Sequence, residues 1–369
     1  LRVIISNTTE AGIAFVDEPK PAAACPASFP AKVAAFLHAR YTHFAGAAEA
    51  GMVLLPCELI DRNGDTLRRI VLQYAGAWGL EPAFRAWVEA HCAFLNTLVD
   101  RIVTGYPKEE AAALRAELGY EDRLLDTGEI FHLWVIEGDA RYRAELPFEE
   151  AGLHVRWTDN LEPYRTRKVR ILNGAHTMTV PAAYLAGCET VREAVDDPLI
   201  GAYLRQGLFR EIIPTLALPE EEKAHFAADV LERFRNPFIR HLLLSIALNS
   251  VSKFAVRVLP SLLAYHQRTG QLPPTLTFSL AALLAFYRGQ FIEDGALQGE
   301  RDGHAYRIVD DRPVLEEFAG AWQVYAQVPE AAPLVRRILG RAAWWGQDLN
   351  AVPGLAAAVT VDLETILRD

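Results

Sequence analysis

The stretch that decides how this chain is organised is KVRILNGAHT, residues 168–177. It places a lysine, an amide and an imidazole (Lys168, Asn173 and His176) in a run of residues that is otherwise largely apolar. On a continuous α-helix, at about 100° per residue, Asn173 lies roughly 140° and His176 roughly 80° round from Lys168, so that all three fit on one side. The Asn173-Gly174 pair is equally compatible with a break between two helices.

These three side chains have complementary chemistry. A lysine that exchanges its proton, beside an amide donor and a neutral imidazole, can polarise a carbonyl group and deliver a proton to its oxygen. Arg165, Arg167 and Arg170 crowd Lys168 in the sequence, and their positive charge is expected to lower its pKa. The structural alternative is a solvated lysine, a helix C-cap and a core histidine, and the spacing alone favours that alternative.

The hydrophobic pattern changes at Leu161. Before it, strand and helix patterns alternate, which predicts an α/β unit over residues 1–158; after it, helix follows helix, which predicts an α-helical unit over residues 159–369. The predicted strands are Leu1–Ile5, Gly51–Cys57, Phe131–Ile136 and Leu153–Trp157, and the predicted helices of the first unit are Pro30–Phe44, Asp65–Ala77, Glu81–Val103 and Lys108–Leu118. Later helices are expected at 162–173, 175–187, 197–212, 219–234, 239–268, 275–288, 313–326, 330–345 and 354–368, with Pro260 ending or kinking the fifth.

Polar residues follow the first two predicted strands. The segment Ser6–Glu10 comes directly after the first strand, and Glu58–Asp65 follows the second. In an open α/β sheet, residues at the carboxyl ends of the strands face the ligand crevice. The alternative is ordinary turn chemistry, because asparagine and threonine also favour loops.

Composition limits the classes of protein to consider. The net charge of -10 and the pI of about 5.6 argue against broad attraction to nucleic acid. No apolar run approaches the roughly 18 residues of a membrane span, and no secretory leader is recognisable, so we expect a soluble, cytoplasmic protein without a membrane partner. The four cysteines are scattered and are expected to be buried thiols, and the histidine spacings predict no metal site.

The stretch from Lys168 to His176 resembles the signature of the long-chain mannitol dehydrogenase family, in which a catalytic lysine is followed by asparagine five residues on and histidine eight residues on. The resemblance covers essentially the whole chain. Four further segments look like the tagaturonate reductase (altronate oxidoreductase) branch: Ser6–Ile13, Pro56–Asp65, Asn96–Pro107 and Asn236–Lys253.

The resemblance implies a metal-independent, NAD-dependent enzyme with part of a Rossmann-like domain followed by a helical substrate domain. No G-x-G-x-x-G motif occurs, so the glycine-rich cofactor turn is expected upstream of Leu1, and the choice between NAD and NADP stays open. The implied catalytic residues are Lys168, Asn173 and His176. The implied substrate-binding residues are Lys253, with Arg240, His241 and Arg257 nearby, and the implied cofactor-binding residues are Asn7, Thr8, Thr9, Glu10 and Asp100.

Two positions depart from the family pattern. Leu59 stands where many members carry an asparagine that donates to the substrate oxygen, and we consider Asn63 or Glu58 as partial substitutes. Ser245 stands eight residues before Lys253, where the polyol branch carries an arginine. This second departure argues against mannitol as the substrate.

The sequence therefore predicts reversible reduction of a keto sugar acid, D-tagaturonate to D-altronate, with Lys168 as general acid and base. Alternatives within the family are a fructuronate reductase and a mannitol 2-dehydrogenase. An alternative of another class is a non-catalytic helical scaffold or fragment that lacks the cofactor loop. The expected partner is a small sugar acid, and the expected assembly is a monomer or a small homo-oligomer.

Overall fold

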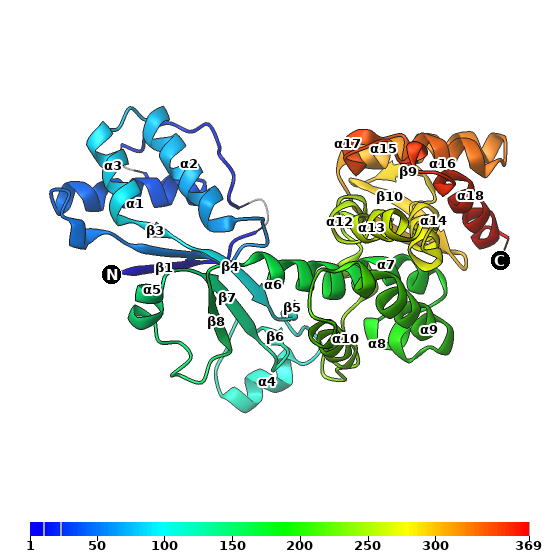
Figure 1. The fold of residues 1–369 in the computed structure, drawn as a ribbon, viewed down its shortest axis with the longest axis horizontal. Helices are drawn as coiled ribbons and strands as arrows, with labels where there is room; N and C mark the ends of the chain where they lie inside the picture. Colours follow the sequence, from blue (N-terminus) through cyan, green and yellow to red (C-terminus); the bar gives the residue numbers. More distant parts are fainter. Residues whose placement is uncertain (10–11, 23, 369) are drawn as a thin grey trace. The chain divides into compact units, whose positions relative to one another are not determined.

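The structure is a computed structural model that describes residues 1–9, 12–22 and 24–368 (Figure 1). It contains two compact units. The first comprises Leu1–Ile102 and Ile130–Arg165, and the second comprises Val103–Glu129 and Thr166–Asp369. The domain boundary expected between residues 158 and 159 stays a prediction.

The first unit is built on a parallel sheet with the order β1-β2-β3. Its strands are β1 (Val3–Ser6), β2 (Val53–Pro56) and β3 (Ala93–Phe94), and Val3 pairs with Val53. All four residues of β2 are buried, as its continuous apolar run predicts for a parallel strand. The helices of this unit's N-terminal part are α1 (Phe29–His43), η1 (Ala48–Ala50), α2 (Asn63–Ala77) and α3 (Pro82–His91).

A second sheet of the first unit has the order β4-β7-β8. Strand β4 (Asn96–Asp100) runs antiparallel to β7 (Leu133–Glu137), and β7 runs parallel to β8 (Val155–Thr158). The remaining helices here are α5 (Ala140–Glu145) and the start of α6 (Glu162–Arg167). A small apolar cluster joins side chains of both sheets: Val53, Leu55, Leu95, Ile136 and Val155.

The helix predicted over Glu81–Val103 is wrong beyond His91. Residues from Ala93 to Asp100 are extended instead, because Ala93 pairs with Val53 of β2 and Asn96 pairs with Glu137 of β7. Strand pairing with distant segments outweighs the local helical pattern, which is a weak determinant in a short apolar run. Asp100 therefore ends a buried strand rather than a helix.

The second unit is mainly helical. It begins with the antiparallel pair β5 (Val103–Gly105) and β6 (Thr127–Gly128), which flank α4 (Ala111–Leu118). The π-helix η2 (Lys168–Asn173) opens the main body. The helices that follow are α7 (Gly174–Leu185), α8 (Val191–Asp196), α9 (Pro198–Gln206), η3 (Gly207–Ile212), η4 (Ile213–Thr215), α10 (Glu220–Phe234), α11 (Leu243–Ile246), α12 (Ser250–Arg257), α13 (Leu259–Thr269), α14 (Pro274–Phe286), α15 (Arg312–Gln327), α16 (Ala331–Leu339), α17 (Ala342–Trp345), η5 (Leu349–Ala351) and α18 (Leu355–Ile366).

Helices α7 and α14 form the centre of this unit. Nearly every residue of both helices is buried, and α14 is apolar on all sides, as expected of a helix surrounded by others. Helix α7 packs against α14, α12, α11 and α9. Among the described residues, no helix is both long and apolar enough to cross a membrane.

Several features of the second unit differ from the predictions: the span 330–345 holds two helices, α16 and α17, and helix α8 and the β5–β6 pair were not predicted. The helix expected over 239–268 is three helices, because Asn249 takes a left-handed conformation before α12 and Pro260 lies in the first turn of α13. The prediction that Pro260 ends or kinks a helix is confirmed. Residues 289–308 were not assigned and form the antiparallel sheet of β9 (Gly289–Glu293), β10 (Ala296–Arg301) and β11 (His304–Ile308).

The two hairpins of this sheet turn at Asp294-Gly295 and Asp302-Gly303, and all four of these residues have positive φ. Asp-Gly pairs with this backbone are the typical short hairpin turn. The signal was present in the sequence, but the charged and polar residues around it obscured the strand alternation.

Candidate active site

The stretch from Lys168 to His176 forms one continuous helical path. Residues Lys168–Asn173 form the π-helix η2, and α7 begins at Gly174 with helical backbone angles at both Asn173 and Gly174. The proposed break at Asn173-Gly174 is therefore wrong, and so is the straight α-helical spacing assumed from the sequence. A π turn is wider than an α turn, and such turns occur frequently at functional sites.

Glycine at position 174 lets another helix approach this turn. A Cβ atom on Gly174 would lie 3.1 Å from the carbonyl oxygen of Arg257, the last residue of α12. Helix α12 also packs on η2 and α7. Because Lys253 and Arg257 lie on α12, this close approach brings both predicted substrate-binding residues to the region of His176.

His176 is buried, with 6% of its surface exposed. Its ring stacks on Phe234, with centroids 4.0 Å apart, and meets the ring of His241 edge-on at 5.2 Å. Burial lowers the pKa of His176 well below its usual value, and the nearby His241, Arg257, Arg233 and Lys253 lower it further. The imidazole is therefore neutral, as the sequence analysis required.

Two polar atoms of the motif lack hydrogen-bond partners among the described residues. They are Nε2 of His176 and Oδ1 of Asn173, and the hydroxyl groups of Thr177 and Thr179 on the same helix share this property. Leaving a buried polar group unsatisfied costs about 1–3 kcal/mol, so native structures retain few of them. Unsatisfied groups of this kind are expected where a ligand binds.

Arg233 and Glu129 belong to this region and were not identified from the sequence. Arg233 lies on α10 directly before Phe234, and its guanidinium group binds the carboxylate of Glu129 through two hydrogen bonds of 3.0 and 2.7 Å. Both side chains are buried, at 7% and 3% exposure. The only sequence signal was the charge itself, because 104 residues separate the partners.

Lys168 is also buried, with 8% of its surface exposed. The arginines expected to crowd it are bound to other groups. Arg165 pairs with Asp61 at 3.1 Å, and Arg167 pairs with Glu222 at 2.6 Å. Arg170 donates to the Ser261 hydroxyl group at 2.8 Å, and burial lowers its pKa to about 10. Two of the three positive charges are therefore compensated, and the lowered pKa expected for Lys168 stays a prediction.

The predicted carboxylate-binding residues do not all lie together. His241 contacts His176, and burial lowers the pKa of His241 to about 4, so it too is neutral. Lys253 donates through Nζ to the carbonyl oxygen of Ile246 at 2.9 Å. Arg240 is exposed and pairs with Glu109 at 2.7 Å. Arg240 is thus exposed, whereas its neighbour His241 is half-buried, and the role of Arg240 in binding stays a prediction.

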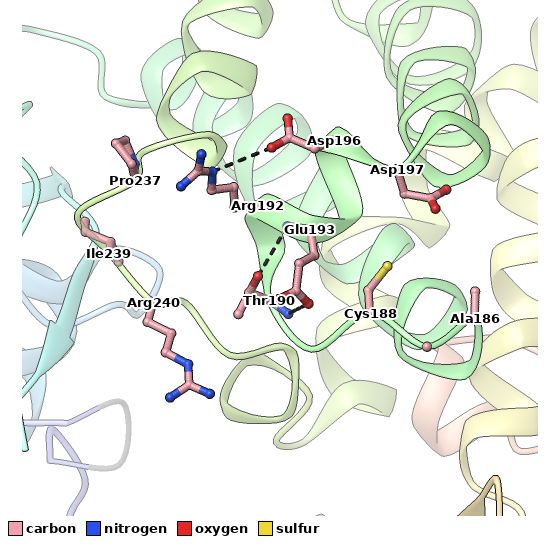
Figure 2. Close-up of a pocket in the computed structure, with 11 residues that line it drawn as sticks. Ala186, Cys188, Thr190, Arg192, Glu193, Asp196, Asp197, Pro237, Ile239 and Arg240 are labelled. Carbon is pink, nitrogen blue, oxygen red and sulfur yellow. Dashed lines mark hydrogen bonds and ion pairs between the residues drawn. The ribbon is translucent and has the colours of Figure 1, made fainter. Parts of the chain in front are cut away.

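Arg240 lines a separate pocket of about 830 Å³ (Figure 2). The other walls come from the loop after α7, from α8 and from the loop around Pro237. Figure 2 shows Arg192 directed towards Asp196, and their side chains are 3.6 Å apart. A cavity of about 10 Å³ lies next to His176, and it holds one water molecule at most.

In the first unit, polar side chains gather at the carboxyl ends of β1 and β2. Glu58 is buried and accepts hydrogen bonds from the Ser6 hydroxyl group and from the backbone and side chain of Thr8, at 2.9–3.1 Å. Asn7, Thr8 and Thr9 are exposed. Asp100 is buried at the end of β4, and Glu10 lies outside the described residues.

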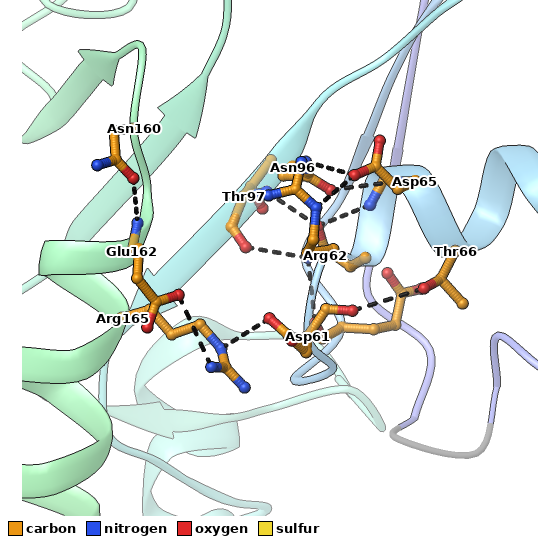
Figure 3. A network of polar contacts seen from close by, with 12 residues as sticks. Asp61, Arg62, Asp65, Thr66, Asn96, Thr97, Asn160, Glu162 and Arg165 are labelled. Atoms are coloured by element: carbon orange, nitrogen blue, oxygen red, sulfur yellow. Dashed lines mark hydrogen bonds and ion pairs between the residues drawn. The ribbon is translucent and has the colours of Figure 1, made fainter.

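Neither suggested substitute for the donor missing at Leu59 is available. The amide group of Asn63 donates to the carbonyl oxygens of Pro56, Glu58 and Thr97 and accepts from the N–H groups of Gly64 and Thr97. Glu58 is a carboxylate that serves as an acceptor. Figure 3 shows the adjoining contacts, in which Asn96 bonds to Asp65 and Arg165 to Asp61.

All four cysteines are free thiols, as expected. Cys25 is exposed and Cys57 is half-buried, so the prediction that all four are buried is wrong for these two. Burial raises the pKa of the Cys57 thiol to about 11, which makes it a poor nucleophile. Among the described residues, no three histidine, cysteine, aspartate or glutamate side chains gather as a metal site would require.

A unit with a parallel sheet and a helical unit in which Lys168 and His176 are buried are the architecture expected of a dehydrogenase of the Rossmann type. Comparison with known families agrees. The mannitol dehydrogenase Rossmann domain matches residues 4–150, and the mannitol dehydrogenase C-terminal domain matches residues 160–367. The chain belongs to the mannitol dehydrogenase family and is an NAD-dependent oxidoreductase.

Individual relatives support this assignment. The chain is 51% identical over 368 residues to the altronate oxidoreductase of Yersinia enterocolitica. The matched region covers 100% of this chain and 74% of the relative. It is 50% identical over 370 residues to the altronate oxidoreductase of Pectobacterium carotovorum, covering 100% and 75%. The resemblance to the altronate oxidoreductase branch is confirmed.

Two solved structures share the fold. One is the Pseudomonas fluorescens mannitol 2-dehydrogenase in a ternary complex with NAD and D-mannitol, with a TM-score of 0.73 and 23% identity, covering 100% of this chain and 72% of that one. The other is a substrate-free D-sorbitol dehydrogenase, with a TM-score of 0.77 and 23% identity, covering 100% and 73%. The predicted fold class, a Rossmann-like unit followed by a mostly helical one, is confirmed.

Proposed function

We propose that this protein reversibly reduces the keto group of a sugar acid, with D-tagaturonate and D-altronate as the substrate pair. The observation that carries the proposal is the positive environment of His176. Its neutral ring lies within the electrostatic influence of Arg257, Arg233 and Lys253. A basic region inside an acidic molecule favours an anionic substrate, and the relatives named altronate oxidoreductase point to the same class.

Lys168 is the proton donor in this proposal. As the keto group is reduced, its ammonium group gives one proton to the carbonyl oxygen, and in the oxidation direction its amine removes that proton again. The burial of Lys168 keeps the exchanging proton away from bulk water. Asn173, through its side-chain amide, holds the developing oxyanion, a contact worth about 2.7–4 kcal/mol at comparable sites.

His176 orients the substrate hydroxyl groups. A neutral imidazole can donate from one ring nitrogen and accept at the other, and Nε2 has no protein partner among the described residues. Lys253 and Arg257 bind the substrate carboxylate, whereas the charge of Arg233 is compensated by Glu129. Arg binds a carboxylate with two parallel hydrogen bonds, which fixes the orientation of the bound acid.

The carboxyl ends of β1 and β2 fit the NAD cofactor of this class. A Cβ atom on Gly12 would overlap the hydroxyl group of Thr8. Glycine at this position therefore lets the backbone lie close to Thr8 and Thr9, next to Asn7. These residues, with Asp100 at the end of β4, would hold the cofactor. The cofactor, when bound, would supply the hydride as NADH and accept it as NAD.

The substrate class is tested by assaying the full-length protein with tagaturonate, fructuronate and fructose side by side. The proposal expects the highest kcat/KM with tagaturonate and the lowest with fructose, because fructose lacks the carboxylate. Lys168→Ala should then lower kcat by a factor of about 10²–10⁴ while leaving NADH affinity unchanged. Preferred use of fructose, or unchanged turnover in Lys168→Ala, would discard the corresponding assignment.

The proposal also covers the oligomeric state of the protein and its cellular compartment. We infer a monomer or small homo-oligomer that acts on a small sugar acid in the cytoplasm, and size-exclusion chromatography with light scattering measures the first of these.

A further inference from the structure

Helix α12 carries Lys253 and Arg257 but does not cap its own N-terminus. The residue before it, Asn249, has a left-handed backbone with φ 53°, and its side chain makes no capping hydrogen bond. A helix of eight residues is too short to be stable by itself, so its orientation depends on contacts with other elements.

The missing cap is supplied by the segment between β11 and α15. The N–H group of Asn249 donates to the carbonyl oxygen of Val309 at 3.0 Å, and the N–H group of Val251 donates to Oδ2 of Asp310 at 3.4 Å. A carboxylate at a helix N-terminus satisfies an unpaired N–H group and interacts favourably with the helix dipole. Asp310 therefore caps α12 although 59 residues separate it from Val251.

Tyr287, at the end of α14, completes this cap. It is fully buried, and its hydroxyl group donates to Oδ2 of Asp310. Burial and the Asp310 carboxylate raise the pKa of Tyr287, so its hydroxyl group stays protonated and remains a donor. Its ring packs on Phe318, with centroids 4.4 Å apart.

Helix α12 is thus fixed at both ends. Its C-terminus contacts Gly174 beside the catalytic motif, and its N-terminus contacts the Asp310–Tyr287 pair. The N–H group of Lys253 donates to the carbonyl oxygen of Asn249, directly before α12, and its Nζ donates to that of Ile246, the last residue of α11. The segment that leads into α12 therefore holds the lysine side chain.

We propose that Asp310 and Tyr287 are positioning residues that fix the first turn of α12 and thereby direct Lys253 and Arg257 towards the substrate carboxylate. Neither residue contacts the substrate. The inference rests on the proposed function, because it assumes that the α12 cations bind the carboxylate of the sugar acid.

The test compares Asp310→Ala, Asp310→Asn and Tyr287→Phe with Asp311→Ala in the full-length protein. Asp311 is the exposed neighbour of Asp310, and its side chain makes no capping contact. Asp310→Ala should raise KM for tagaturonate by about tenfold while kcat changes by less than about threefold and KM for NADH stays constant. Tyr287→Phe should act in the same direction, and Asp311→Ala should leave all three parameters unchanged.

Rescue by the conservative variant separates positioning from general stability. Asparagine at position 310 still accepts from Val251 and Tyr287, so Asp310→Asn should restore KM to within about threefold of the parent value. A folded Asp310→Ala or Tyr287→Phe protein with unchanged KM for tagaturonate would overturn the inference. Should Asp310→Ala fail to fold, Tyr287→Phe decides, because it removes one hydroxyl group and keeps the ring.

Lys253→Ala distinguishes failure of this inference from failure of the proposed function. If Lys253→Ala raises KM for tagaturonate and the Asp310 and Tyr287 variants do not, the positioning role alone is wrong. If Lys253→Ala also leaves KM unchanged, the proposed carboxylate site is wrong and the inference falls with it.

Discussion

Two asparagines, Asn63 in the first unit and Asn173 in the second, differ in how their polar atoms are used. The Asn63 side chain is fully engaged, joining the loop after β2, the start of α2 and strand β4 through five hydrogen bonds. Asn173 ends a π turn, and its Oδ1 atom has no partner among the described residues. The Asn63 amide is used within the fold, whereas Oδ1 of Asn173 can accept a hydrogen bond from a ligand; the proposed contact with an oxyanion would use the Nδ2 group of the same amide.

The same contrast extends to charged groups around His176. The Arg233–Glu129 pair is buried and bidentate, so both charges are compensated. In the same region, Nε2 of His176 has no hydrogen-bond partner among the described residues. Glu129 lies at the end of the segment 103–129, which also carries Glu109. Glu109 pairs with Arg240 on the surface. The ion pairs of Glu129 and Glu109 therefore differ in burial and in their number of hydrogen bonds.

The largest effect on stability is expected from Glu129→Ala. Removing one partner of a buried ion pair leaves an uncompensated charge, so the free energy of unfolding should fall by about 3–5 kcal/mol. Glu109→Ala is the matched control, and loss of this exposed pair should cost less than about 1 kcal/mol. Denaturant unfolding of the two variants measures the difference. If both variants lose the same free energy of unfolding, burial does not make the Glu129–Arg233 pair more important for stability than the exposed pair.

A second test exchanges the two asparagines for alanine. Asn63→Ala should lower the free energy of unfolding by about 3 kcal/mol, because buried N–H and carbonyl groups lose their partners. Asn173→Ala should lower kcat by a factor of about 10²–10³, the cost of one oxyanion donor. Its free energy of unfolding should change by no more than about 0.5 kcal/mol, because alanine is the better helix former. Thermal unfolding and steady-state kinetics on both variants provide the comparison, which fails if Asn173→Ala loses stability rather than turnover.

The smallest of these effects is a pH dependence. Burial lowers the folded pKa of His241 to about 4 and that of His176 well below 6.5. Below pH 6.5 the unfolded chain therefore binds more protons than the folded protein, and stability is lost as the pH falls. Each histidine lowers the free energy of unfolding by up to about 1.4 kcal/mol for each pH unit of acidification. For His241 this loss ends near pH 4, where the folded protein also binds the proton.

His241→Gln should flatten this pH dependence between pH 6.5 and 5. The matched control is His225→Gln, because the His225 side chain is 81% exposed and removing it should leave the slope unchanged. The free energy of unfolding is measured by denaturant titration at several pH values. If the free energy of unfolding of the parent and of His241→Gln depends on pH with the same slope, His241 is not neutral in the folded protein.

The elements that were predicted correctly from the sequence depend on short-range physics. The continuous apolar run of Val53–Pro56 is a buried parallel strand, and Pro260 begins a helix because its ring cannot be accommodated in a helix interior. The stretch from Lys168 to His176, together with four further segments, was sufficient to indicate the family, although the spacing alone favoured a structural role. Each of these features is encoded within a few residues, where composition and steric limits act directly.

Tertiary structure decided the rest. Strand β4 replaced a predicted helix because Asn96 pairs with a strand some forty residues later in the chain. The π turn, the neutral rings of His176 and His241, the Arg233–Glu129 pair and the Asp310 cap all depend on partners brought together only by folding. Burial and electrostatic environment are properties of the packed molecule, so the sequence supplied the proposed catalytic groups, and packing determined their neighbours and the charge states of the two histidines.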